Sequence, residues 1–144
     1  MQDISLSLPS DPKLLRAIRC MMAELAELSG LSGKDSERIC LAVDEACSNI
    51  IRHSYKGRTD GQIIIRCALE ADKLKISIRD FGEKFDPDKL QPPDGATPRP
   101  GGLGIQMMKS IMDTVEYDCS HEVGTEIHLT KYLSLRETRN GSKR

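Results

Sequence analysis

The sequence has few aromatic residues: it contains no tryptophan, and phenylalanine and tyrosine together make up 3% of its 144 positions. Domains that bind single-stranded nucleic acid stack bases on aromatic rings, and this sequence offers few such rings. Neither sign of charge dominates, because 21 basic residues stand against 22 acidic ones and the formal net charge is −1. We therefore expect no nucleic-acid partner and no anionic membrane surface as a partner.

Close-set cysteine and histidine motifs are absent as well. The five cysteines form no CxxC pair and the three histidines form no HExxH motif, although such spacings mark many zinc sites. An odd number of widely spaced cysteines indicates reduced thiols in the cytoplasm rather than a disulfide framework. No apolar run has the length of a membrane span, and the first residues, MQDISLSLPSD, lack the basic start and apolar core of a signal peptide.

The composition that remains is that of an ordinary folded domain, with 38% hydrophobic and 30% charged residues. The length suits one domain with one core, which we place at residues 1–133. Residues 134–144 are charged and polar, and we expect them to form a disordered tail.

Periodicity predicts the order of the elements. Strands are expected at 3–8, in a hairpin within 61–80, and at 114–120 and 125–132; helices are expected at 11–29, 34–55 and 103–113. Residues 86–101 are rich in Pro, Asp and Gly and have no periodicity, which is typical of a functional or mobile loop. Because strands and helices do not alternate regularly, we expect an α+β two-layer sandwich, with a mostly antiparallel mixed sheet and helices packed on one face.

The two long helices each carry an apolar stripe. On the helix at 34–55, Glu45, Asn49 and Arg52 lie away from the stripe and His53 lies at its edge; a solvated face is the ordinary reason for such a group. The residues expected to be buried are Leu14, Leu15, Ile18, Met21, Met22, Leu25 and Leu28 in the first helix, and Ile39, Val43, Ala46, Cys47, Ile50 and Ser54 in the second.

Two polar residues occupy strand positions where the pattern calls for apolar ones. Asp80 continues the inward set of the strand LKISIRD, and Thr125 continues the inward set of the last strand. A buried carboxylate needs a partner, so the pair could outline a polar notch in an apolar pocket. The alternatives are a strand-end cap or turn residue for Asp80, since Gly82 follows it, and a hydroxyl bonded to its own backbone for Thr125.

A glycine-rich stretch, PGGLGI at 100–105, precedes the third helix. Glycines there let backbone N–H groups approach an anion, which the helix N-terminus also attracts. A flexible hinge is the ordinary explanation, but the position at the end of a long loop favours a phosphate site.

Four motifs in this order resemble those of the GHKL ATPase superfamily, and more closely those of the bacterial anti-sigma-factor serine kinases. They are E-A-x-x-N-x-x-x-H from Glu45 to His53, DFGEKFDP from Asp80, GGLG at 101–104, and the pair Gly124-Thr125. The resemblance covers about residues 5 to 132. It implies a Bergerat-type ATP-binding fold with a flexible ATP lid between the second and third motifs.

The resemblance also implies a role for each motif residue. Asn49 would ligate Mg²⁺ and Glu45 would be the general base, while Asp80 and Thr125 would bind adenine. The residues implied to bind the nucleotide are Asn49, His53, Asp80, Gly82, Gly101, Gly102, Leu103, Gly104, Gly124 and Thr125. His53 could equally stabilise the helix end. The sequence departs from many relatives in having Lys84 where they have a second glycine, and in carrying Arg99 further from the glycine run.

The function implied is an ATP-dependent serine/threonine protein kinase that is also an anti-sigma factor. It would phosphorylate a STAS-type anti-anti-sigma protein, bind a sigma factor or similar regulator, and form a homodimer. One alternative is a non-catalytic module whose nucleotide state selects its protein partner. Another is a detached histidine-kinase domain, which the missing second glycine and the lack of a phospho-acceptor helix disfavour.

Overall fold

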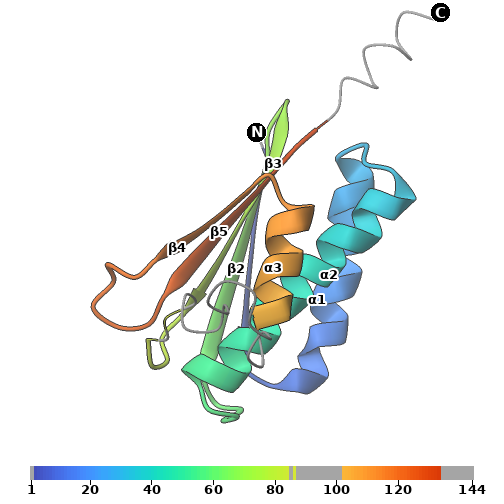
Figure 1. The fold of residues 1–144 in the computed structure, drawn as a ribbon. Helices are drawn as coiled ribbons and strands as arrows, with labels where there is room; N and C mark the ends of the chain where they lie inside the picture. Colours follow the sequence, from blue (N-terminus) through green and yellow to red (C-terminus); the bar gives the residue numbers. More distant parts are fainter. Residues whose placement is uncertain (1, 85, 87–101, 134–144) are drawn as a thin grey trace, which may run out of the picture.

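The computed structural model describes residues 2–84, 86 and 102–133, and shows two layers, a sheet and a set of helices (Figure 1). The sheet has five antiparallel strands in the order β1-β2-β3-β5-β4. The strands are β1 (Gln2–Pro9), β2 (Gln62–Leu69), β3 (Lys73–Asp80), β4 (Thr114–Asp118) and β5 (Glu126–Tyr132). The helices are η1 (Pro12–Leu14), α1 (Leu15–Leu28), α2 (Gly33–Asn49), η2 (Ile50–Ser54) and α3 (Gly102–Ile111).

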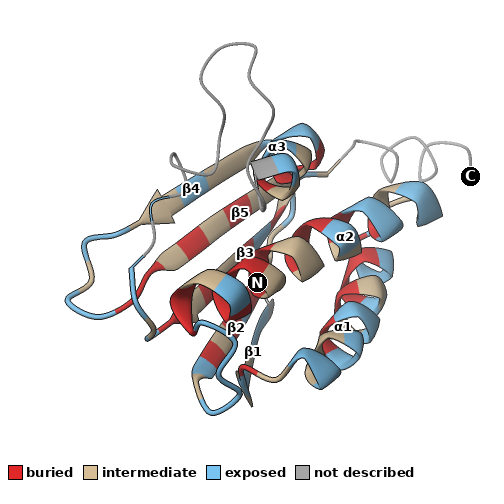
Figure 2. Cartoon of the chain, turned by 60° about the horizontal axis from the view of Figure 1, so that its bottom comes forward, coloured by how far each residue is buried: buried red, intermediate tan, exposed pale blue. Residues whose placement is uncertain are grey.

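This arrangement confirms the predicted α+β sandwich and the order of its elements. The apolar stripes of the helices cover one face of the sheet, where buried residues gather in Figure 2. Every residue of the expected stripe on the second helix is buried. The prediction for the first helix was only partly correct: Ile18, Met22 and Leu25 are buried. Leu14, Leu15 and Met21 are partly buried, and Leu28, at the last position of α1, is 70% exposed.

Helix α2 does not end as an ordinary α-helix. It continues into η2, one turn of π-helix, and such turns are frequent at functional sites. The turn is tied to the end of β3: the Glu83 N–H donates to the Ser54 carbonyl at 2.7 Å. The Tyr55 hydroxyl accepts from the Phe81 N–H at 2.8 Å and donates to the Gln62 carbonyl. These bonds hold the end of the second helix against the turn that follows β3.

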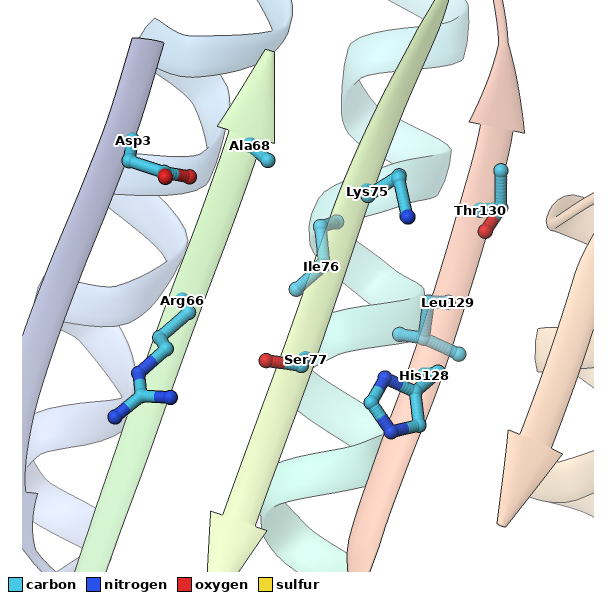
Figure 3. A pocket seen from close by; sticks show the side chains of 9 residues that line it. All are labelled: Asp3, Arg66, Ala68, Lys75, Ile76, Ser77, His128, Leu129 and Thr130. Atoms are coloured by element: carbon cyan, nitrogen blue, oxygen red, sulfur yellow. The ribbon is translucent and has the colours of Figure 1, made fainter. Parts of the chain in front are cut away.

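The other face of the sheet is mostly polar, and none of the helices among the described residues covers it. Figure 3 shows it from close by, with Arg66 on β2, Lys75 and Ser77 on β3, and His128 on β5. Among the residues that the structure describes, none of the helices is both long enough and apolar enough to cross a membrane.

Candidate nucleotide-binding site

Asp80 is the central buried charge of the helix-covered face. It ends β3 and is 1% exposed, as strand alternation predicted. Its Oδ1 accepts a hydrogen bond from the Gly82 N–H at 3.1 Å. Burial raises the pKa of this carboxyl, while the Gly82 N–H and the neighbouring Arg79 guanidinium act in the opposite direction. The carboxylate is therefore held at an energetic cost that a ligand with hydrogen-bond donors would relieve.

Thr125 lies beside Asp80 because the loop before β5 passes close to the end of β3. The Asp80 N–H donates to the Thr125 carbonyl at 2.9 Å. Gly124 permits this approach in two ways: its φ is +74°, and a Cβ there would collide with the Asp80 carbonyl. The Gly-Thr pair of the sequence thus positions Thr125 next to the carboxylate.

A narrow cavity lies between α2 and the sheet at this point. Its walls combine an apolar surface with two buried polar atoms that have no hydrogen-bond partner among the described residues: Asn49 Nδ2 and Thr125 Oγ1. Since buried polar groups are nearly always paired, these atoms point to a missing ligand. The lining residues are Ala46, Asn49, Ile50, Ile78, Asp80, Tyr117, Thr125 and Ile127.

Glu45 lies one helical turn before Asn49, which lines this cavity, and an arginine joins the two side chains. Arg52 Nη2 donates to Asn49 Oδ1 at 2.9 Å and lies 3.4 Å from Glu45 Oε1. Asn49 is 1% exposed, so it does not lie on a solvated face. Arg52 is half-exposed and covers the two other side chains from outside.

The start of α3 lies against Glu45. Gly104 lies so close to Glu45 that a Cβ at this position would collide with the Glu45 carboxylate. Leu103 is 66% exposed, so its side chain is not part of the core. The N-terminus of α3 therefore opens toward the Glu45 side of the cavity, where its N–H groups favour an anion. Gly102 begins the helix, and Gly101 and Arg99 lie outside the described residues.

Two further motif residues have positions that the sequence left open. His53 is half-buried on η2 and does not line the cavity; burial lowers its pKa, as do Arg52 and Lys56. Lys84 donates to the Cys119 carbonyl at 2.8 Å, which ties the turn after β3 to the turn after β4.

Sequence reasoning missed two residues of the site. Arg52 was recognised only as part of a polar face, and its contacts with Glu45 and Asn49 depend on side-chain placement that periodicity does not reveal. Tyr117 lines the cavity from β4, and burial, followed by the charge of Glu45, raises its pKa above the usual range. The inward set Val115 and Tyr117 of that strand was the available signal.

Two features of this two-layer sandwich are typical of nucleotide-binding ATPase domains: a buried carboxylate in an apolar cavity, and a helix that begins with glycines next to a second carboxylate. The family model described as a histidine kinase-like ATPase domain matches residues 8–131. The chain therefore belongs to the family of histidine kinase-like ATPase domains, and ATP is its nucleotide.

Within that family, the chain is similar to serine-protein kinases called RsbW. It is 32% identical to the RsbW of Bacillus subtilis, with 91% of this chain and 86% of the relative covered. It is 28% identical to the RsbW of Listeria monocytogenes, with 97% and 93% covered. At this identity and coverage the chain is a serine/threonine protein kinase of the RsbW type.

Two solved structures share the fold. The RsbU and RsbW domains of a Mycobacterium tuberculosis protein match with a TM-score of 0.67 and 19% identity, over 91% of this chain and 32% of that one. A blue-light activated histidine kinase of Erythrobacter litoralis matches with a TM-score of 0.55 and 17% identity, over 88% and 43%. These two likenesses support the fold class alone.

Proposed function

We propose that this kinase transfers the terminal phosphoryl group of ATP to a serine of a STAS-type anti-anti-sigma protein, and that it binds a sigma factor or similar regulator. The observation that carries the nucleotide site is the cavity with a buried carboxylate and two buried polar atoms without partners. The resemblance of the motifs to anti-sigma-factor kinases supports the choice of protein partners.

The adenine end of ATP would occupy the inner part of the cavity, which would have to widen to admit the purine. The Asp80 carboxylate would accept a hydrogen bond from the exocyclic amino group, and Thr125 Oγ1 would gain the partner that it lacks. The apolar walls would contact both faces of the purine. Gly82 and Gly124 shape this end by holding the backbone near Asp80.

The phosphates would lie between the end of α2 and the start of α3. The N–H groups of residues 101–104 would bind the phosphate oxygens. Asn49 Oδ1 would ligate Mg²⁺, and the ion would supply charge neutralisation on the phosphates. Arg52 must leave Asn49 Oδ1 for this to happen. His53 would support the end of the helix that carries Asn49.

Transfer needs a base near the phosphates, and Glu45 is the carboxylate in that position. It would take the proton from the serine hydroxyl as the serine oxygen attacks the γ-phosphorus. The bond between that phosphorus and the bridging oxygen then breaks and ADP leaves. The new phosphate adds negative charge to a close interface, so we expect the phosphorylated partner to dissociate.

We also propose a cellular compartment, a domain extent and an oligomeric state for this protein. All five cysteines are free thiols in the structure, which suits a cytoplasmic protein. We propose that residues 1–133 fold as one domain and that the chain acts as a homodimer, which sedimentation of the purified protein would test.

A second candidate function is a non-catalytic switch that selects its partner by nucleotide state. The Arg52 contact favours it, because the guanidinium engages both Glu45 and Asn49, the residues assigned to transfer and to Mg²⁺, whereas it does not line the cavity assigned to adenine. Single-turnover transfer of labelled phosphate from Mg-ATP to a STAS protein encoded nearby separates the two functions.

The sharpest test compares three variants on helix α2 in the same assay. Glu45→Ala should keep ATP binding and lose transfer by about 10²- to 10⁴-fold, the usual contribution of a general base. Asn49→Ala should lose the Mg²⁺-dependent part of ATP binding. Glu37→Ala removes an exposed carboxylate from the same helix and should behave as wild type. Normal transfer by Glu45→Ala would show that another group is the base.

A further inference from the structure

A second group of ligating side chains lies on the open face of the sheet, away from the nucleotide cavity. Asp118 ends β4, Glu126 begins β5 and His121 lies in the turn between them. One ligating atom from each lies within 4.8 Å of the others. Because side chains alternate along a strand, Asp118 and Glu126 point away from the face on which Tyr117 and Ile127 line the cavity.

The two carboxylates of this group lack a full counter-charge. Asp118 and Glu126 are direct cross-strand neighbours, and like charges in that position repel. Arg79 lies opposite Glu126 on β3, but its guanidinium donates to backbone carbonyls of the adjoining turn. In the described part of the chain, the ion-pair partners of the Glu126 carboxylate are the imidazoles of His121 and His128.

The separations fit a tetrahedral metal centre. His121 Nε2 lies 3.0 Å from Glu126 Oε1 and 3.6 Å from Asp118 Oδ2, and His128 Nε2 lies 3.8 Å from the same Glu126 oxygen. Ligands about 2.0 to 2.2 Å from a tetrahedral zinc ion stand about 3.3 to 3.6 Å apart, close to the two separations that His121 makes. His128 lies outside the group of three whose ligating atoms are all within 4.8 Å of one another, so its side chain must move further to join them.

Hydrogen bonds to its other oxygen hold the Asp118 carboxylate in place, as is usual for metal ligands. The Ser120 N–H and hydroxyl both donate to Asp118 Oδ1, at 2.9 and 2.5 Å. This leaves Oδ2 on the side of His121. Such outer hydrogen bonds orient ligands and strengthen metal binding.

We propose that Asp118, His121 and Glu126 bind a divalent transition-metal ion of the zinc type, with His128 as a fourth ligand. A mixed set of imidazole and carboxylate ligands selects Zn²⁺ or Co²⁺ over Mg²⁺. The site is open to solvent, since the Asp118 side chain is 38% exposed and that of His121 33%. His128 lies on the open face beside Ser77, as Figure 3 shows.

The test uses the untagged, nucleotide-free chain with Cys20→Ser and Cys119→Ser, because those two cysteines are exposed thiols that also bind such ions. Calorimetric titration with Zn²⁺ should give one ion per chain, and Co²⁺ should give a visible absorption band without a thiolate transition. His121→Ala and Glu126→Gln should each weaken Zn²⁺ binding at least tenfold. Glu122→Gln, an exposed carboxylate in the same turn, should leave the dissociation constant within twofold.

The metal-free unfolding midpoint of each variant checks that it folds. Zn²⁺ should raise that midpoint for the background protein and for Glu122→Gln, but not for His121→Ala. Absence of Zn²⁺ binding by the background protein would overturn the proposal. Equal dissociation constants for all variants would overturn it too.

Discussion

At the scale of single residues, the site is built from side chains that are unfavourable without a ligand. Asp80 is buried with a raised pKa, and Asn49 and Thr125 each bury a polar atom that has no partner in the described part of the chain. Each group costs stability in the empty protein and becomes satisfied when the nucleotide binds. The charges of Asp80 and Arg52 should therefore affect both stability and nucleotide binding.

Asp80→Asn should separate binding from stability. The amide keeps an oxygen for the Gly82 N–H but loses the charge, so ATP binding should weaken about 10- to 100-fold, measured by calorimetry. The pKa of Asp80 lies above its ordinary value of 3.8 in the folded state, so the folded protein holds the proton more tightly than the unfolded chain. The protonated carboxyl therefore contributes to the wild-type free energy of unfolding below pH 3.8. This contribution is lost as the pH rises from 3.8 through the raised pKa of the folded state.

Urea unfolding at pH 4 and pH 7 measures the second effect. The variant should gain on the wild type between the two values, because it has no carboxyl to ionise at this position. Asp3→Asn, an exposed change on β1, is the matched control and should show no such gain. If Asp80→Asn instead lost stability relative to the wild type between pH 4 and pH 7, the buried charge would not carry the cost that we assign to it.

Arg52→Gln should strengthen Mg-ATP binding by about two- to fivefold. The guanidinium donates to the Asn49 oxygen that we assign to Mg²⁺, and its charge repels the ion. The ion pair between Arg52 and Glu45 is exposed, so its removal is worth about 0.2 to 1 kcal/mol. Arg38→Gln, an exposed change on the same helix, should leave affinity unchanged. Weaker binding by Arg52→Gln would indicate instead that this arginine contacts the phosphates.

At the scale of elements, the site depends on three segment ends that meet. The end of α2, the turn after β3 and the start of α3 converge on Glu45 and Asp80. The π-turn η2 lets the second helix end against the β3 turn, where the Ser54 carbonyl accepts the Glu83 N–H. Helix α3 approaches this junction without a side chain at Gly104, and that absence sets its distance from Glu45.

Gly104→Ala should therefore impair transfer more than stability. The added methyl group would displace the Glu45 carboxylate, which is the movable end of a side chain, so the unfolding free energy should change by less than about 1 kcal/mol. Transfer of labelled phosphate should fall at least tenfold, because the base is moved. Gly33→Ala is the matched control: it also adds a methyl at a helix start, but into open space. Full transfer by Gly104→Ala would mean that α3 moves away from Glu45 during the reaction.

At the scale of the whole molecule, one core joins both layers. Buried residues of α1, α2, α3 and the sheet form a single cluster. Cys67 on β2 lies 3.8 Å from the sulfur of Met22 on α1, and Cys47 packs from α2. Burial raises the pKa of Cys47 to about 12 and that of Cys67 to about 11. These thiols therefore report on opening of the core from two different layers.

Thiol labelling should divide the cysteines accordingly. Cys20 and Cys119 are exposed and should react at once, whereas Cys47 and Cys67 should react only when the domain unfolds, both at the same rate. Mg-ATP at 100 times its dissociation constant should slow both buried thiols about 100-fold, because binding stabilises the fold by about 2.7 kcal/mol. Labelling of Cys20 should not change. Different rates for Cys47 and Cys67 would show that β2 and α2 open separately.

The sequence by itself determined the order of the elements and most of the residues that face inward, although Leu28 is exposed. Local periodicity sets which side of a helix or strand is apolar, so the burial of Asp80 and Thr125 could be predicted from alternation alone. The sandwich class followed from element order. The nucleotide site was indicated by the resemblance of four motifs, taken in order, to those of the GHKL ATPases; the glycine-rich stretch at 100–105 alone favoured only an anion site.

Only the tertiary structure decided which polar groups meet. The contact of Arg52 with Asn49 depends on side-chain placement at a helix end, and the approach of α3 to Glu45 depends on packing between segments distant in sequence. The register of β4 with β5 brings Asp118 beside Glu126, although no sequence motif marks them. Periodicity fixes the face on which a residue lies, whereas long-range pairing and packing fix its neighbours.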